Sequence, residues 1–117
     1  MVTLVRGIII DVDLDPTKGS ETGKLRPCIV VTNDIYNARV PVIQVTPITA
    51  WNDKKARIIT NITLEPSATN GLLKRSIADC LQTRPIDYKQ RFVRVRGRLN
   101  IDELGQVDIA LRKVFGI

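Results

Sequence analysis

The sequence predicts a mainly β fold, a small antiparallel barrel or sandwich, that ends in one helix. Its 117 residues, 44% hydrophobic and 26% charged, are typical of one soluble domain, which we assign to residues 1–117. Short runs rich in β-branched residues recur between turn residues, a pattern typical of antiparallel strands. Only the last segment changes to the three- and four-residue spacing of a helix.

These runs predict six strands. The stretch at residues 28–31 is apolar throughout and predicts a strand that is buried on both faces. In the last run, Arg94, Arg96 and Arg98 alternate with valine or glycine, which predicts a positive stripe on one face of the sheet. A solvated outer sheet face is the alternative explanation of this alternation. The predicted strands are residues 4–12, 26–32, 42–48, 57–64, 76–81 and 92–99.

The C-terminal segment predicts the helix, and we expect it to pack on the sheet. Asn100 is a favourable N-cap, and Glu103 occupies the partner position of a capping box. Gly116 can end the helix, because glycine readily adopts the left-handed conformation common at that point. The apolar face consists of Ile101, Leu104, Val107, Ala110, Leu111, Val114 and Phe115.

Charge and missing residue types restrict the possible chemistry. Lys and Arg number 18 against 12 Asp and Glu, and the resulting net charge of +6 favours a polyanion or an acidic partner. The chain has no His, which excludes imidazole acid–base catalysis, catalytic triads built on His and His-ligated metal sites. We expect no cofactor.

The cysteines and the apolar runs predict the compartment. Cys28 and Cys80 match no zinc-binding spacing, so reduced core thiols are expected, with a disulfide between them as the alternative. No run approaches the roughly 18 apolar residues of a membrane span, and the N-terminus lacks a small-residue cleavage site. We therefore expect a cytoplasmic protein that does not interact with a membrane.

Two polar loops are candidate sites of chemistry. Residues 13–25 form a stretch with Gly and Pro that is longer than a tight hairpin needs, and such loops are often functional. A simple surface connection is the alternative. In the second loop Trp51, the only Trp, precedes three nearby cations, which suits base stacking and phosphate attraction. Trp51 covering the end of a barrel is equally compatible with this pattern.

A further set of short segments is informative because of its order and spacing. These segments are Arg6-Gly7, residues 12–21, Arg26-Pro27 before the 28–31 run, Asn33-Asp34, and residues 47–49, 82–84, 86–87, 97–99 and 107–111. Together they resemble the MazF/PemK family of toxin endoribonucleases, the toxic halves of bacterial toxin-antitoxin modules. The resemblance spans nearly the whole chain.

This resemblance implies a fold, an activity and partners. The implied fold is a small SH3-like β-barrel of the MazF/PemK/CcdB type with a C-terminal helix, in agreement with the element pattern. The implied activity is metal-independent, sequence-specific cleavage of single-stranded RNA by 2′-hydroxyl attack, which leaves a 2′,3′-cyclic phosphate and a 5′-hydroxyl. The implied partners are the RNA, a cognate antitoxin protein and a second copy of the chain in a homodimer.

The resemblance also implies site residues. Arg26 is expected to stabilise the transition state, since a guanidinium grips two phosphate oxygens in a fork. Thr49 is expected to orient the scissile phosphate or pass a proton, and Glu21 to act as a base or to organise Arg26. The expected RNA contacts are Ser20, Lys24, Asn33, Gln82 and Arg84, together with Trp51 of the second loop.

Some positions depart from the family pattern. Several members carry an acid at the position of Leu81, and some an Arg at the position of Asp79, so a mechanism that uses this pair is not available here. Some members also have a His where this chain has Leu25. Two other functions stay open: a non-catalytic nucleic-acid-binding regulator on the same fold, and a gyrase poison of the CcdB type.

Overall fold

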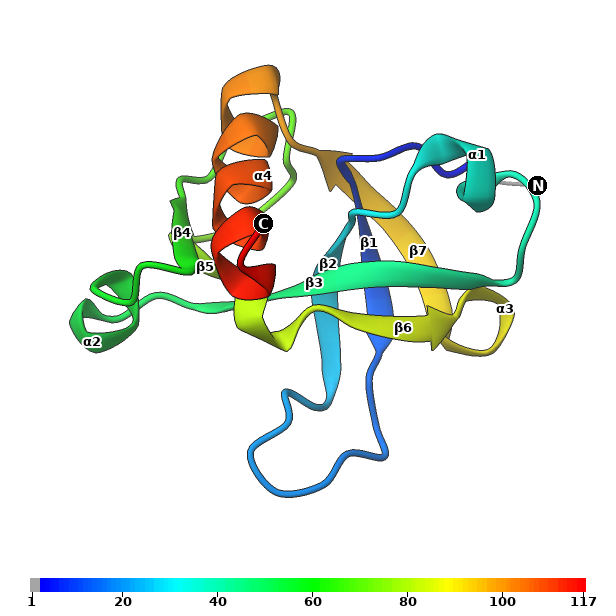
Figure 1. Ribbon diagram of the computed structural model, residues 1–117, viewed down its shortest axis with the longest axis horizontal. Helices are drawn as coiled ribbons and strands as arrows, with labels where there is room; N and C mark the ends of the chain where they lie inside the picture. The colour runs from blue at the N-terminus through cyan, green and yellow to red at the C-terminus, as the bar shows by residue number, and fades with distance from the viewer. Residues whose placement is uncertain (1–2) are drawn as a thin grey trace.

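An antiparallel sheet and one long helix make up the protein, of which the computed structural model describes residues 3–117 (Figure 1). The strands are β1 (Ile8–Asp13), β2 (Leu25–Val30), β3 (Val42–Ala50), β4 (Asn61–Leu64), β5 (Ser76–Asp79), β6 (Arg84–Asp87) and β7 (Phe92–Arg98). The helices are α1 (Asp34–Asn37), α2 (Asp53–Ala56), α3 (Tyr88–Arg91), α4 (Ile101–Phe115) and the 3-10 helix η1 (Cys80–Gln82).

The sheet is curled but open. Its strand order is β4-β5-β3-β2-β1-β7, and β6 pairs with β3 beside this path. Among residues 3–117 the two ends of the path do not pair with each other, so the barrel is incomplete. The predicted class, mainly β with a C-terminal helix, is confirmed.

The long strand β3 pairs with three different strands along its length, and this change of partner positions the candidate site described below. Residues 42–45 of β3 pair with β6, residues 45–47 with β2, and residues 48–50 with β5. Thr49 therefore lies where β3 has left β2 and begins to pair with β5. The loop that joins β1 to β2 extends beyond the end of these two paired strands, as the blue segment at the bottom of Figure 1 shows.

Apolar side chains on the two faces of the sheet form two clusters. One cluster lies between the sheet and α4 and includes Ile9, Ile29 and Val107; the other lies on the opposite face and includes Cys28 and Val30. Consecutive residues of β2 therefore enter different clusters, as the alternation of a strand requires. The predicted burial of this strand on both faces is confirmed.

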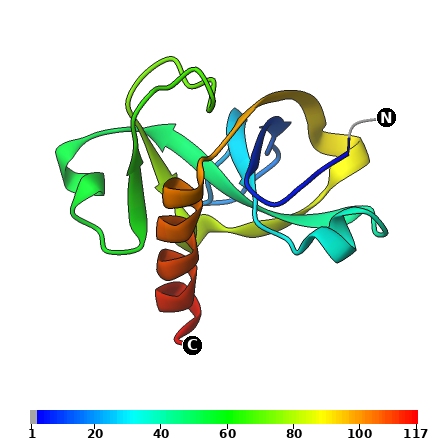
Figure 2. The same ribbon diagram turned by 90° about the horizontal axis from the view of Figure 1, so that it is seen from above.

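Helix α4 forms as its sequence predicts. The side chain of Asn100 accepts a hydrogen bond from the Glu103 N–H at 2.8 Å, and the Glu103 carboxylate accepts one from the Asn100 N–H at 2.9 Å. Gly116 ends the helix with φ of 70°. Val107 and Ala110 are fully buried against the sheet, and Figure 2 shows the helix standing against one side of it.

Several strand predictions need correction. The strand predicted at residues 4–12 begins only at Ile8, and the one predicted at residues 76–81 ends at Asp79, where η1 follows. The predicted strand at residues 57–64 begins only at Asn61, because α2 and a turn occupy the preceding residues. Strand β6 was not predicted, since its four residues include a proline and two charged residues and only Ile86 is buried. Antiparallel backbone pairing with β3, which lies about 40 residues earlier in the chain, makes this segment a strand.

Bulges in β7 overturn the predicted positive stripe. The pairing of β1 with β7 contains two register shifts, and each extra residue reverses the alternation of side chains. As a result Arg94 lies opposite Asp11 whereas Arg98 lies opposite Ile8, and these two β1 positions face opposite sides of the sheet. Arg94 and Arg96 both bind Asp11, and Arg98 does not join them.

Both cysteines are free and buried, which confirms the expected core thiols. Burial raises the pKa of the Cys28 thiol and of the Cys80 thiol to about 12, so both are protonated at neutral pH. None of the helices between residues 3 and 117 combines the length and the apolar character needed to cross a bilayer.

Candidate active site

A polar hollow of about 480 Å³ lies between the β1–β2 loop and the end of β3. It gathers residues from the loop, from β2 and β3, from α2, and from the segment around η1. The residues predicted to act on RNA that line it are Ser20, Glu21, Lys24, Arg26, Thr49 and Gln82. The other lining residues are Thr17, Thr22, Gly23, Lys55 and Asp79.

The loop wall of the hollow is fixed by hydrogen bonds. The Glu21 carboxylate accepts a hydrogen bond from the Lys18 N–H at 2.6 Å, and the Asp15 carboxylate accepts one from the Lys24 N–H at 2.9 Å. Glycine suits position 23, because the Cβ of any other residue would lie only 2.5 Å from the Asp15 carboxylate. The loop therefore has a defined shape without secondary structure.

Gln82 ties this loop to the rest of the domain. Its side-chain amide donates to the Ser20 carbonyl at 3.2 Å and accepts from the Thr22 N–H at 3.2 Å. Both ends of the amide thus hold backbone 60 or 62 residues away in the chain. Whatever it contributes to RNA contact, Gln82 first positions the loop.

Arg26 projects from β2 with its charge unpaired. Its Nε donates to the Gly23 carbonyl at 2.9 Å, and within residues 3–117 no carboxylate lies within ion-pair distance of its guanidinium. Glu21, which is expected to act as a base or to organise Arg26, forms no ion pair with it within residues 3–117, and its carboxylate accepts a hydrogen bond from the Lys18 N–H. The terminal nitrogens of Arg26 are left to bind an anion.

Thr49 contributes the hydroxyl of the hollow that comes from β3. It is half-buried on β3 opposite Ile77 of β5, so its backbone is held in the sheet. Its hydroxyl oxygen lies 3.4 Å from Nζ of Lys55.

Five residues of the hollow were not predicted as site residues, and two of them, Lys55 and Asp79, are charged. Lys55 was noted only as one of three cations near Trp51, and Asp79 only as a departure from the family pattern. Burial raises the pKa of Asp79 above its usual value, although the backbone N–H of Gln82 and the charge of Lys55 oppose this shift. Their convergence depends on the pairing of β3 with β5, which no local sequence signal reveals.

Three predicted RNA contacts lie outside this hollow. Arg84 lines an adjacent hollow with Glu21 and Gln82, and its guanidinium donates to the Leu14 carbonyl at 3.2 Å. Asn33 is the N-cap of α1 and lines neither hollow.

Trp51 is the third. Its Nε1 lies 3.3 Å from the Thr63 hydroxyl, and the Arg75 guanidinium lies 4.1 Å from the ring centroid. One face of the indole is therefore covered by a side chain of the same chain, so the proposed stacking of a base on Trp51 is restricted.

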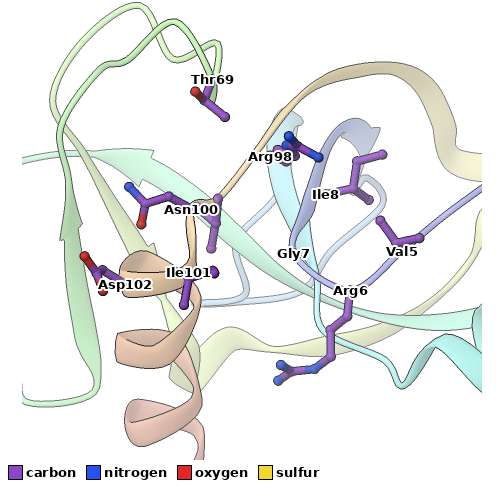
Figure 3. A pocket seen from close by; sticks show the side chains of 10 residues that line it. Val5, Arg6, Gly7, Ile8, Thr69, Arg98, Asn100, Ile101 and Asp102 are labelled. Atoms are coloured by element: carbon purple, nitrogen blue, oxygen red, sulfur yellow. The ribbon is translucent and has the colours of Figure 1, made fainter.

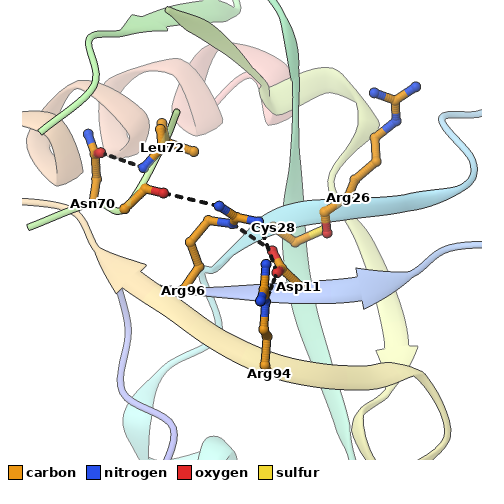
Figure 4. Close-up of polar contacts among 8 residues, drawn as sticks. Asp11, Arg26, Cys28, Asn70, Leu72, Arg94 and Arg96 are labelled. Atoms are coloured by element: carbon orange, nitrogen blue, oxygen red, sulfur yellow. Dashed lines mark hydrogen bonds and ion pairs between the residues drawn. The ribbon is translucent and has the colours of Figure 1, made fainter. Parts of the chain in front are cut away.

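Another hollow, of about 400 Å³, shares Arg26 with the polar hollow between the β1–β2 loop and β3. Its floor contains Asp11, which is 3% exposed and binds Arg94 at 2.5 Å and Arg96 at 2.8 Å (Figure 4). Burial alone would raise the pKa of Asp11, but the hydrogen bonds and charges of Arg96 and Arg94 lower it below the usual value. Arg96 also donates to the Gly71 carbonyl at 3.0 Å, which links β7 to the loop before β5.

A larger hollow, about 680 Å³, lies elsewhere, near the start of α4 (Figure 3). Arg6, Arg98 and Asp102 line it, and it contains none of the residues predicted to act on RNA. Size alone therefore does not locate the site. Among residues 3–117, acidic residues and cysteines form no group of three or more suited to hold a metal ion.

Comparison with known proteins gives a consistent result. The model of the family described as PemK-like, MazF-like toxin of type II toxin-antitoxin system matches residues 5–115. The endoribonuclease MazF9 of Mycobacterium tuberculosis is 38% identical over 112 residues, which cover 92% of each chain. The endoribonuclease EndoA of Bacillus subtilis is 36% identical over 107 residues, covering 92% of this chain and 90% of EndoA.

Solved structures show the same fold. MazF from Deinococcus radiodurans superposes with a TM-score of 0.84 at 20% identity and covers 100% of both chains. A mycobacterial endoribonuclease in complex with its cognate antitoxin superposes with a TM-score of 0.76 at 17% identity, covering 97% of this chain and 96% of that one.

Proposed function

Because the chain belongs to the family of PemK-like, MazF-like toxins of type II toxin-antitoxin systems, we propose that it is a metal-independent, sequence-specific endoribonuclease. Its substrate is single-stranded RNA, and its products end in a 2′,3′-cyclic phosphate and a 5′-hydroxyl. The observation that carries this proposal is the convergence of the unpaired Arg26 guanidinium and the Thr49 hydroxyl on one polar hollow.

The residues of the hollow have separate roles in this reaction. The 2′-oxygen attacks the adjacent phosphorus, so that a 2′-O–P bond forms and the P–O5′ bond breaks. Glu21 accepts the proton of the 2′-hydroxyl, and water supplies a proton to the departing 5′-oxygen. Arg26 binds the nonbridging oxygens, whose charge increases as the attack proceeds, and the Thr49 hydroxyl orients the phosphate. No residue is covalently modified.

The loop wall supplies the contacts that select the sequence. Ser20, Lys24 and Gln82 present a hydroxyl, a cation and an amide beside Arg26, and such groups suit a phosphate or the edge of an unstacked base. This set leaves out Arg84, Asn33 and Trp51, which do not line the hollow.

Two protein partners complete the proposal. A cognate antitoxin is supported by the solved complexes of similar toxins, and an acidic segment suits the net charge of +6. A homodimer is supported by the unpaired outer edge of β7, where Val93 and Val95 are exposed. We place the activity in the cytoplasm.

The experiment that tests the activity is cleavage of a long unstructured RNA by the purified protein in EDTA, with mapping of the new ends. We expect discrete cuts with cyclic phosphate and 5′-hydroxyl ends. Arg26→Ala and Thr49→Ala are each expected to lower the cleavage rate by roughly 10²- to 10³-fold, the usual loss for one transition-state donor. Arg39→Ala removes an exposed guanidinium outside the hollow and is expected to cleave like the wild type.

Three outcomes would contradict parts of this proposal. No cleavage by a folded wild-type protein across many sequences would favour a nucleic-acid-binding regulator. Binding to gyrase in place of RNA would favour a CcdB-like poison. Cuts that persist in both the Arg26 and the Thr49 variants would show that the site is elsewhere.

A further inference from the structure

Lys55 is held firmly in the hollow, although it belongs to the short helix α2. The Asn52 side chain accepts a hydrogen bond from the Lys55 N–H at 2.7 Å, and Asn61 donates one to the Lys55 carbonyl at 3.0 Å. The side chain is half-buried, in contrast to that of the adjacent Lys54, which is exposed. The sequence around Lys55 thus fixes its backbone where its side chain reaches the hollow.

The ammonium group of Lys55 has only neutral partners. Its Nζ lies 3.4 Å from the Thr49 hydroxyl oxygen and 3.4 Å from the Ala50 carbonyl oxygen. Within residues 3–117 no carboxylate lies within ion-pair distance of it. Since an ammonium has three N–H donors, at least one is left for a ligand.

The hollow therefore contains two cations, Arg26 and Lys55, that form no ion pair within residues 3–117, with Thr49 in contact with the second. Two carboxylates, Glu21 and Asp79, also line it but form no ion pair with either cation. Because Lys55 is half-buried, its ammonium is less hydrated than that of an exposed lysine and gains more from an anion bound in the hollow.

We infer that Lys55 is a catalytic residue of RNA cleavage, whose ammonium binds a nonbridging oxygen of the scissile phosphate together with Arg26. This inference rests on the proposed function. A phosphodiester carries one negative charge, and attack by the deprotonated 2′-oxygen adds a second. One guanidinium matches the charge of the ground state, whereas two cations match that of the transition state. Lys55 keeps its protons throughout, so it leaves the atom and proton balance of the reaction unchanged.

Lys55 also affects the hydroxyl that touches the phosphate. A threonine hydroxyl has one donor and two acceptor sites. The N–H of Lys55 occupies an acceptor site of Thr49, so the single proton of the hydroxyl is directed to another partner, such as the phosphate. The two residues thus act as one unit.

The test compares Lys55→Met with Lys54→Met in single-turnover cleavage of an RNA that the wild type cuts. Both variants remove one positive charge from α2, but only Lys55 lines the hollow. Lys55→Met is expected to lower the rate at saturating protein by about 10²-fold, because one transition-state cation is lost. Lys54→Met is expected to stay within about threefold of the wild type, as is usual for an exposed charge.

Further variants separate charge from structure. Lys55→Gln keeps a hydrogen-bond donor for Thr49 without the charge and is expected to lose as much rate as Lys55→Met. Lys55→Arg keeps the charge and is expected to recover part of the rate. Thermal melting of each variant reports on folding, and the Gln and Arg variants carry the test if the Met variant is unstable.

The outcomes distinguish failure of the inference from failure of the proposed function. If the wild type cuts RNA and Lys55→Gln cuts at the same saturating rate, Lys55 is not catalytic. A Lys55 variant that loses only RNA affinity, with an unchanged saturating rate, also overturns the inference. If the folded wild type itself cuts no RNA, the proposed function has failed.

Discussion

Two carboxylates line the hollow, and for one of them, Asp79, the protein environment raises the pKa. It is half-buried at the end of β5, immediately before η1. Burial raises its pKa, and the Gln82 N–H and the Lys55 charge only reduce that effect. In the folded protein the carboxylate therefore holds its proton to a higher pH than in the unfolded chain.

This shift predicts a pH-dependent gain in stability for Asp79→Asn. Above the usual value of 3.8 and up to the raised pKa, the folded state binds more protons than the unfolded state, so the stability of the wild type falls as the pH rises. The variant lacks this loss and is expected to melt at a higher temperature than the wild type at neutral pH. Melting curves of both proteins across the acid range measure the effect.

The low-pH end of the same series is the internal control. Well below the usual pKa of 3.8, Asp79 is protonated in both folded and unfolded wild type, so the difference between the two proteins is expected to shrink. A difference in melting temperature that stays constant across the series would contradict the assigned pKa shift. Cleavage by the variant, measured alongside, shows whether this carboxylate also takes part in the reaction.

At the scale of elements, two glycines occupy opposite environments. Gly97 lies in β7 where residues 69–70 cross it, and a Cβ there would approach the Thr69 carbonyl oxygen to 2.4 Å. The neighbouring Arg98 N–H donates to that same carbonyl at 3.0 Å, so the close approach is part of the structure. Gly105, in α4, has no atom within 4 Å of an added Cβ.

The same substitution is therefore expected to have opposite effects at these positions. Gly97→Ala is expected to lower the free energy of unfolding by about 2–3 kcal/mol, because the crossing loop has to move. Gly105→Ala is expected to raise it by about 0.5–1 kcal/mol, because alanine is the better helix former. Urea denaturation of the wild type and both variants measures the changes. A loss of stability in Gly105→Ala comparable with that in Gly97→Ala would contradict this account.

At the scale of the whole molecule, the net charge of +6 does not by itself show which cations are free to bind RNA. Arg94 and Arg96 neutralise Asp11, Arg6 pairs with Asp108, and Arg75 pairs with Glu65. In the hollow, by contrast, Arg26 and Lys55 have no such partners among residues 3–117, and Lys24 lines the same wall. The hollow therefore offers three cations to RNA, beside the carboxylates of Glu21 and Asp79.

The three cations of the hollow predict a moderate salt dependence of RNA binding. With three cations in contact with phosphates, the slope of log affinity against log salt is expected to be about −2, a loss of roughly 10- to 20-fold between 50 and 200 mM. An RNA with a 2′-deoxy nucleotide at the cleavage position, which cannot be cut by this mechanism, is the suitable ligand. A slope near zero would contradict phosphate binding, and one beyond about −5 would indicate contacts far outside the hollow.

The sequence by itself determined the features that depend on local order. The spacing of apolar residues and the Asn100–Glu103 capping box were sufficient for α4, because helix hydrogen bonds and caps join residues three or four apart. The strand buried on both faces was also visible as an apolar run. Resemblance in the order of short segments identified the family and suggested Arg26 and Thr49.

Only the tertiary structure decided which of the suggested residues meet. Lys55 and Asp79 enter the hollow because β3 changes partner from β2 to β5, and Trp51 is covered because Arg75 crosses to it. The bulge that separates Arg94 from Arg98 arises from the pairing of β7 with β1. Each of these features depends on contacts between residues far apart in the chain, and such contacts leave no periodicity in the sequence to predict them.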